Sequence, residues 1–175
     1  MGDSSSALLN VDNLAVHYAQ RPAHPFAARH VTRAVDGISF DVARGSAFGI
    51  VGESGSGKST TAAAIMRLTE ITSGRITFDG TAVGSLKGEA LRKFRQRMQM
   101  VFQDPYSSLD PRCRVGAIVE EPLNIQNIGT RRERENRVTE LLDLVGLRPG
   151  VQRLFPHQFS GGQRQRIGIA RALAT

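Results

Sequence analysis

The sequence predicts a mixed α/β fold in a single domain, and three observations support this. The chain has 175 residues, 40% of them hydrophobic and 22% charged, which is ordinary for one folded domain. Short apolar or alternating runs fill its first half, whereas apolar residues recur at three- and four-residue steps from about residue 114 onward. A turn with three glycines in six residues separates an apolar run from a helix-like segment. Strands with intervening helices are therefore expected.

The first strand is expected at residues 8–18, and residues 19–33 are expected to form a loop because they carry two prolines and no clear period. Two further strands are predicted at 34–42 and 46–51. The second of these is almost wholly apolar, which is typical of a strand buried on both faces. A helix from about 58 to 69 follows the glycine-rich turn.

The rest of the chain is predicted to change from strands to helices. A strand at 75–80 ends in a turn, and a short apolar strand is expected at 98–102. Residues 114–148 have helical periodicity. A last helix is predicted to begin after residues 160–162 and to run to the end.

Composition excludes several classes of protein. No apolar run approaches the roughly 18–20 residues of a membrane-spanning helix. The first residues lack the basic and apolar regions of a secretory signal. The single cysteine, Cys113, excludes an internal disulfide framework. We therefore expect a soluble, cytosolic domain.

The chain is basic, with 23 Lys and Arg against 16 Asp and Glu, a net charge of +7 and a pI near 10.7. Such a balance raises nucleic acid or an anionic membrane surface as partners. The cations fall into short clusters at 92–95, 131–134 and 164–166, and Glu133 and Glu135 interleave with the middle one. This arrangement is typical of solvated helix faces, so charge alone does not decide the partner.

The glycine-rich turn carries the chemistry, because it fits the phosphate-binding pattern G-x-x-x-x-G-K-[ST] between a predicted strand and a predicted helix. Glycines let the backbone turn its N–H groups inward around an anion, and the following helix adds its positive dipole end. The alternative, a flexible Gly/Ser loop, does not explain the Lys-Ser-Thr ending. The candidate residues are Gly52, Glu53, Ser54, Gly55, Ser56, Gly57, Lys58, Ser59 and Thr60.

Two side chains in this turn have distinct expected roles. Lys58 places a positive charge at the β- and γ-phosphates of a nucleoside triphosphate, and the Ser59 hydroxyl ligates Mg²⁺. The sequence therefore predicts binding of ATP or a similar nucleotide together with Mg²⁺.

A second cluster, residues 157–166, reads H-Q-F-S-G-G-Q-R-Q-R and places Ser-Gly-Gly at a helix N-terminus. It resembles the signature motif of the ATP-binding cassette (ABC) ATPases, with Phe159 where the family most often has Leu. The resemblance implies contact with the γ-phosphate held by an opposite subunit. The alternative is an ordinary helix cap with glycine flexibility. The residues concerned are Ser160, Gly161, Gly162 and Gln163.

Two more features match the same family. Residues 98–105 resemble its Q-loop, which implies that Gln103 reaches Mg²⁺ and the attacking water and that neighbouring residues connect to a transmembrane partner. Asp104 does not fit the Walker B carboxylate, because Gln103 separates it from the apolar run. Tyr18 matches the aromatic residue that stacks on adenine, although it can also be a plain strand-end tyrosine.

The residues at 33–40, 103–112 and 155–159 resemble in detail those of the oligopeptide/dipeptide and nickel importer ATPases. The resemblance implies a P-loop NTPase fold of the ABC ATPase type with an incomplete core sheet. Residues 1–175 are expected to form one partial nucleotide-binding domain. Its parts are a β-rich nucleotide-binding region at about 8–105, an α-helical subdomain at about 106–158, and the signature motif with its helix at 159–175.

The function implied is an ATP-binding, energy-coupling subunit of a membrane importer that drives peptide uptake. The implied partners are a second ABC ATPase subunit (identical or not), transmembrane permease subunits and, indirectly, a solute-binding protein, at the cytoplasmic face of the membrane. A nucleic-acid maintenance ABC ATPase is the first alternative. The 57 positions from Gln103 to Ser160 leave no room for its long coiled-coil insertion, so no nucleic acid is expected.

The second alternative is a non-catalytic nucleotide-binding fragment. In the family, a strand ending in Asp-Glu follows the signature helix, and a switch histidine comes later. The 175 residues contain neither the Walker B glutamate nor the switch histidine. We therefore expect them to be the N-terminal part of a longer subunit and to bind ATP by themselves without appreciable hydrolysis.

Overall fold

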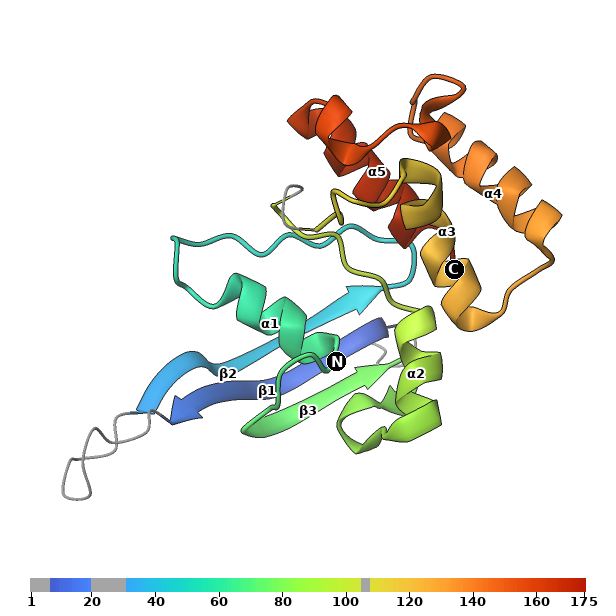
Figure 1. Ribbon diagram of the computed structural model, residues 1–175. Coiled ribbons are helices and arrows are strands. Elements are labelled where there is room, and N and C mark those ends of the chain that lie inside the picture. Colours follow the sequence, from blue (N-terminus) through green and yellow to red (C-terminus); the bar gives the residue numbers. More distant parts are fainter. Residues whose placement is uncertain (1–6, 20–30, 105–107) are drawn as a thin grey trace, which may run out of the picture. The chain divides into compact units, whose positions relative to one another are not determined.

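The computed structural model describes residues 7–19, 31–104 and 108–175 (Figure 1). The chain divides into two compact units, Met1–Arg95 and Gln96–Thr175. Within the described residues, no helix is both long and apolar enough to cross a membrane.

The first unit is built on an antiparallel sheet with the strand order β2-β1-β3-β4 (Figure 1). The fully buried side chains of Val11, Leu14, Val16 and Ile76 lie in its core. The strands are β1 (Ala7–Ala19), β2 (Val31–Ala43), β3 (Ser73–Phe78) and β4 (Thr81–Ala82). The long β1–β2 pair confirms the strands predicted at 8–18 and 34–42, and β3 confirms the one at 75–80.

Helix α1 (Lys58–Ile65) packs on β1 and β2 in this unit. A 3₁₀ turn, η1 (Val83–Ser85), leads to α2 (Gly88–Gln96), a helix that has no counterpart among the predicted elements. The α2 side chain Phe94 meets Phe78 of β3 edge to face, with ring centroids 5.6 Å apart. Arg95 donates to the carbonyls of Met66 and Arg67, so α2 holds the segment that follows α1.

The second unit is helical. Its long helices are α3 (Val115–Gln126), α4 (Arg131–Leu144) and α5 (Gly161–Ala172), with short 3₁₀ turns η2 (Val151–Arg153) and η3 (Pro156–Gln158) before α5. The helices enclose one apolar core, whose most buried side chains are Val115, Val119, Leu141 and Ile167. The apolar positions at three- and four-residue steps face this core, as amphipathic helices require.

The predicted buried strand at 46–51 is wrong for this structure. Residues 46–51 have no regular secondary structure and are exposed, and Val51 is 97% exposed. The Phe48 ring stacks on the Phe40 ring, with centroids 4.8 Å apart. A β-strand is held in place by backbone hydrogen bonds to neighbouring strands, and none of the described strands pairs with this segment. The same reason applies to residues 98–102, which are also irregular rather than a strand.

Helix ends differ from the expected ones because of residues with positive φ. Helix α1 stops at Ile65 rather than near 69, since Arg67 has φ 54° and cannot continue it. The stretch 114–148 is two helices, because Asn127 (φ 55°) and Gly129 (φ 68°) interrupt it. Of the predicted loop 19–33, residues 31–33 belong to β2, and residues 20–30 lie outside the described residues.

The start of α4 carries a complete capping box. Thr130 Oγ1 accepts from the Glu133 N–H, and the Glu133 carboxylate accepts from the Thr130 N–H at 2.6 Å. These hydrogen bonds from the Thr130 N–H and hydroxyl hold the pKa of Glu133 below its usual value. The box is therefore fully formed at neutral pH and is lost as the pH falls through that lowered pKa.

We expect Thr130→Ala to destabilise the first turn of α4 by about 1 kcal/mol, because the cap hydroxyl is removed. Hydrogen exchange at the amides of residues 131–134 measures this directly. Asn136→Ala, a polar-to-Ala change at an exposed interior position of the same helix, is the control and should leave those amides unchanged. Equal protection in both variants would contradict the capping role.

Candidate functional site

The glycine-rich turn closes around the Lys58 side chain. Its ammonium donates to the backbone carbonyls of Gly52 at 2.8 Å and Glu53 at 2.6 Å, and lies 3.2 Å from Ser56 Oγ. The Ser56 N–H donates to the Glu53 carbonyl at 3.2 Å, which tightens the turn. The positive charge is thus held at the centre of a loop made by the six residues that precede it.

The backbone of this loop requires glycine at two points. Gly55 has φ 84° and Gly57 has φ 91°, a region that L side chains rarely adopt. Helix α1 begins directly after Gly57, which has no side chain to cap the first N–H groups of the helix. Free N–H groups at a helix start, together with the helix dipole and the nearby Lys58 ammonium, favour an anion.

Gly57 also lies against strand β2. A Cβ added at Gly57 would come within 2.1 Å of the Ala34 carbonyl oxygen and 3.4 Å of Val35 Cγ2. This close approach fixes the start of α1 on the β1–β2 pair. The loop is therefore carried by the sheet of the first unit.

The hydroxyl side chains of the turn differ in their exposure. Ser54 is exposed, and Ser59 is exposed in the first turn of α1, with Thr60 beside it half-buried. No group of three His, Cys, Asp or Glu side chains that could hold a metal occurs among the described residues. A hydroxyl such as that of Ser59 suits Mg²⁺, which keeps most of its other ligands as waters and phosphate oxygens.

Tyr18 lies near the end of β1 with its side chain 45% exposed. Its hydroxyl and that of Thr69 are 3.2 Å apart and share a hydrogen bond. The hydrogen bond to Thr69, in the segment after α1, thus holds the hydroxyl end of the ring, and much of the ring surface stays exposed and open for stacking.

The second unit carries the other candidate residues. Ser160 caps α5: its Oγ accepts from the Gln163 N–H at 3.4 Å, and Gln163 Oε1 accepts from the Ser160 N–H at 3.0 Å. Among the described residues, no atom beyond the adjoining backbone lies within 4 Å of the points where a Cβ would stand on Gly161 and Gly162, so their backbone is open to approach. Gln103 lies in an exposed irregular segment, as a loop residue should.

Tyr18 and residues 52–60 belong to the first unit, and Gln103 and residues 160–163 belong to the second. Sequence reasoning missed the close approach of Ala34 to Gly57 and the contact of Thr69 with Tyr18. Neither has a sequence signal, because each depends on the pairing of residues far apart in the chain.

Known proteins similar to this chain belong to one family. A family model described as "ABC transporter" matches residues 35–175. The oligopeptide transport ATP-binding protein AppF of Bacillus subtilis is 54% identical over 142 residues, which cover 81% of this chain and 43% of AppF. The glutathione import ATP-binding protein GsiA of Pectobacterium atrosepticum is 48% identical over 167 residues, 95% of this chain and 27% of GsiA.

A relative in Brucella ovis, whose name describes a peptide import ATP-binding protein, is 49% identical over 170 residues, 97% of this chain. The chain spans about half the length of that relative, with 51% covered.

Solved structures give the fold. A dimeric ATP-binding cassette, MJ0796 in a post-hydrolysis state with ADP and Pi, aligns with a TM-score of 0.82 at 31% identity, over 95% of this chain and 69% of that one. The cbiO1 protein of Clostridium perfringens, part of an ABC transporter complex, aligns with a TM-score of 0.75 at 27% identity, over 97% and 62%. These alignments confirm the predicted α/β fold of the ABC ATPase type, and with the match over residues 35–175 they show that the chain belongs to the ABC transporter family.

Proposed function

We propose that this chain is part of the ATP-binding, energy-coupling subunit of a membrane importer for peptides. The observation that carries the proposal is the Lys58 ammonium enclosed by the Gly52–Ser56 backbone at the uncapped start of α1. The names of the relatives in Bacillus subtilis and Brucella ovis support peptides as the cargo.

In this proposal the first unit holds ATP. Lys58 exchanges its carbonyl partners for β- and γ-phosphate oxygens, and the N–H groups of Gly55, Gly57 and the first turn of α1 bind the same oxygens. Tyr18 stacks on the adenine. Ser59 is the proposed protein ligand of Mg²⁺ in this unit, and the ion neutralises charge on the phosphates when bound. The Ser59 hydroxyl side chain is exposed and so is open to such a ligand, and the Gln103 amide of the second unit is exposed as well.

The second unit serves a partner subunit. The start of α5 (Ser160 to Gln163) is the proposed contact with the nucleotide of a second ABC ATPase, which is consistent with the dimeric form of the solved MJ0796 cassette. The proposed further partners are permease subunits and, through them, a solute-binding protein. The chain would then work at the cytoplasmic face of the membrane.

A chimera tests this function in cells. The segment of AppF that aligns with this chain is replaced by this chain's own residues, in Bacillus subtilis that lacks native AppF. We expect the chimera to support ATP-dependent oligopeptide uptake, because the nucleotide loop and the signature helix are retained. The matched control is the same chimera with Lys58→Ala, which should be expressed equally and should not support uptake.

The result can fail in two distinguishable ways. A chimera that binds ATP and co-purifies with the permease but imports no peptide would overturn the proposed coupling of this chain to peptide import. A chimera that is folded and does not bind ATP would overturn the nucleotide site itself. The purified 175 residues should bind ATP without turnover, and turnover abolished by Lys58→Ala would contradict that expectation.

A further inference from the structure

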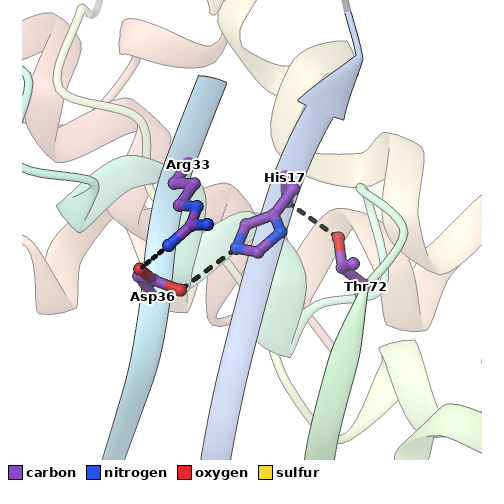
Figure 2. Close-up of polar contacts among 4 residues, drawn as sticks. All are labelled: His17, Arg33, Asp36 and Thr72. Carbon is purple, nitrogen blue, oxygen red and sulfur yellow. Dashed lines mark hydrogen bonds and ion pairs between the residues drawn. The ribbon is translucent and has the colours of Figure 1, made fainter. Parts of the chain in front are cut away.

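Three polar side chains form a cluster across β1 and β2, next to Tyr18 in the sequence (Figure 2). His17 Nε2 donates to Asp36 Oδ1 at 3.2 Å, and the Arg33 guanidinium donates to Asp36 Oδ2 at 3.3 Å. The hydrogen bonds from His17 and then Arg33 lower the pKa of Asp36, so its carboxylate accepts both bonds at neutral pH.

The cluster closes over a β-bulge. Val16 pairs with Val35, but the next residue, His17, pairs with Arg33, so Ala34 is an extra residue on β2. The Arg33–Asp36 ion pair spans this bulge, and His17 bonds to it from the opposite strand. The bulged residue, Ala34, is the one whose carbonyl lies against Gly57 of the phosphate loop.

The other side of β1 is held as well. The His17 N–H donates to Thr72 Oγ1 at 2.8 Å (Figure 2), and the Tyr18 hydroxyl meets Thr69. Thr69 and Thr72 belong to the segment between α1 and β3. Successive side chains on a strand point to opposite faces of the sheet. The cluster around the His17 side chain therefore ties β1 to β2 on one face, and the Tyr18 side chain projects from the other face.

We propose that His17, Arg33 and Asp36 are positioning residues that set the offset between the Tyr18 ring and the phosphate loop. The inference rests on the proposed ATP binding of this site. A fixed offset favours a ligand with a base and phosphates at the matching separation. The cluster thereby makes the site prefer a nucleoside triphosphate to a bare triphosphate, because a bare triphosphate contacts the phosphate loop but not Tyr18.

The cluster is too exposed to be explained as a stabilising ion pair. The side chains of His17, Asp36 and Arg33 are 24%, 55% and 67% exposed. Pairs at such positions contribute little to stability, because water and salt screen them. Removing the Asp36 charge should therefore leave the fold intact and change the position of Tyr18.

The test compares ATP with inorganic tripolyphosphate on the 175-residue chain. We expect Asp36→Asn to weaken ATP binding about fivefold, because the pre-organised base contact is lost. Binding of tripolyphosphate should stay unchanged. The matched control is Asp41→Asn, which removes another carboxylate of β2 that accepts a cross-strand bond, from Asn10 at 2.6 Å. If Asp36 only stabilised the β1–β2 pair, Asp36→Asn and Asp41→Asn would change ATP binding equally.

A spectroscopic readout follows Tyr18 itself. The chain has no tryptophan and two tyrosines, so Tyr106→Phe leaves Tyr18 as the single source of tyrosine emission. ATP should quench this emission by stacking, and Asp36→Asn should reduce the quenching at saturation. His17→Gln, which keeps an N–H donor toward Asp36, should retain the ATP preference, whereas His17→Ala should lose it.

The outcomes separate this inference from the proposed function. If the unsubstituted chain binds neither ATP nor tripolyphosphate, the proposed function fails. If it binds ATP and Asp36→Asn weakens both ligands equally, or neither, the positioning role is overturned. A loss of ATP preference in Asp41→Asn equal to that in Asp36→Asn would also overturn it, because a general loosening of the strand pair would then suffice.

Discussion

Replacing Lys58 by alanine is expected to weaken ATP binding by about 100-fold, close to 3 kcal/mol. In the structure the Lys58 ammonium is held by two carbonyls and lies beside a hydroxyl, inside the loop that we propose to hold the phosphates. Charge-assisted hydrogen bonds to phosphate are the strongest contacts available to such a site. Alanine removes the charge and all three donors at once.

The loss should be one of binding rather than of folding. The carbonyls of Gly52 and Glu53 belong to exposed residues, so water can replace the lysine as their donor. Lys87→Ala is the control, because it removes an exposed lysine elsewhere in the first unit. Calorimetric titration with Mg-ATP should separate the two variants, and thermal unfolding should not. Wild-type affinity in Lys58→Ala would show that the loop does not use this charge.

The phosphate loop could be predicted from the sequence because its geometry is local. Gly57, a fixed position of the pattern, adopts positive φ, as does Gly55, and the helix begins at Lys58 as predicted. The cap at Ser160 is local in the same sense, because Gln163 lies one turn away. In both of these motifs the partners lie within a few residues of one another.

The predictions that were wrong depended on distant partners. The apolar run 46–51 has the composition of a buried strand, but a strand needs neighbours, and none of the described strands pairs with it. The early end of α1 depends on Arg67 at φ 54°, a residue type that favours helices. Tertiary contacts fix that turn, because the Arg67 carbonyl accepts from Arg95 at 2.7 Å. No local pattern reports such a bond.

The second large effect is expected at Gly57. Gly57→Ala should destabilise the first unit by about 2–4 kcal/mol, because two costs combine. An L side chain at φ 91° is strained, and its Cβ would lie 2.1 Å from the Ala34 carbonyl oxygen, a backbone atom that cannot rotate away. Strand β2 or the start of α1 must therefore shift. ATP affinity should fall as well, since that start forms part of the loop.

Gly45 provides the matched control for this prediction. It has φ 72°, and in the part of the chain that the structure describes no atom beyond its chain neighbours lies within 4 Å of the point where its Cβ would stand. Gly45→Ala therefore carries the conformational strain alone, about 1 kcal/mol. Hydrogen exchange at the β1 and β2 amides measures the stability of the first unit in both variants. Because the two glycines share the left-handed backbone, the difference between the variants measures the close approach of the loop to Ala34. Equal destabilisation would show that the loop and the β2 bulge are not mechanically coupled.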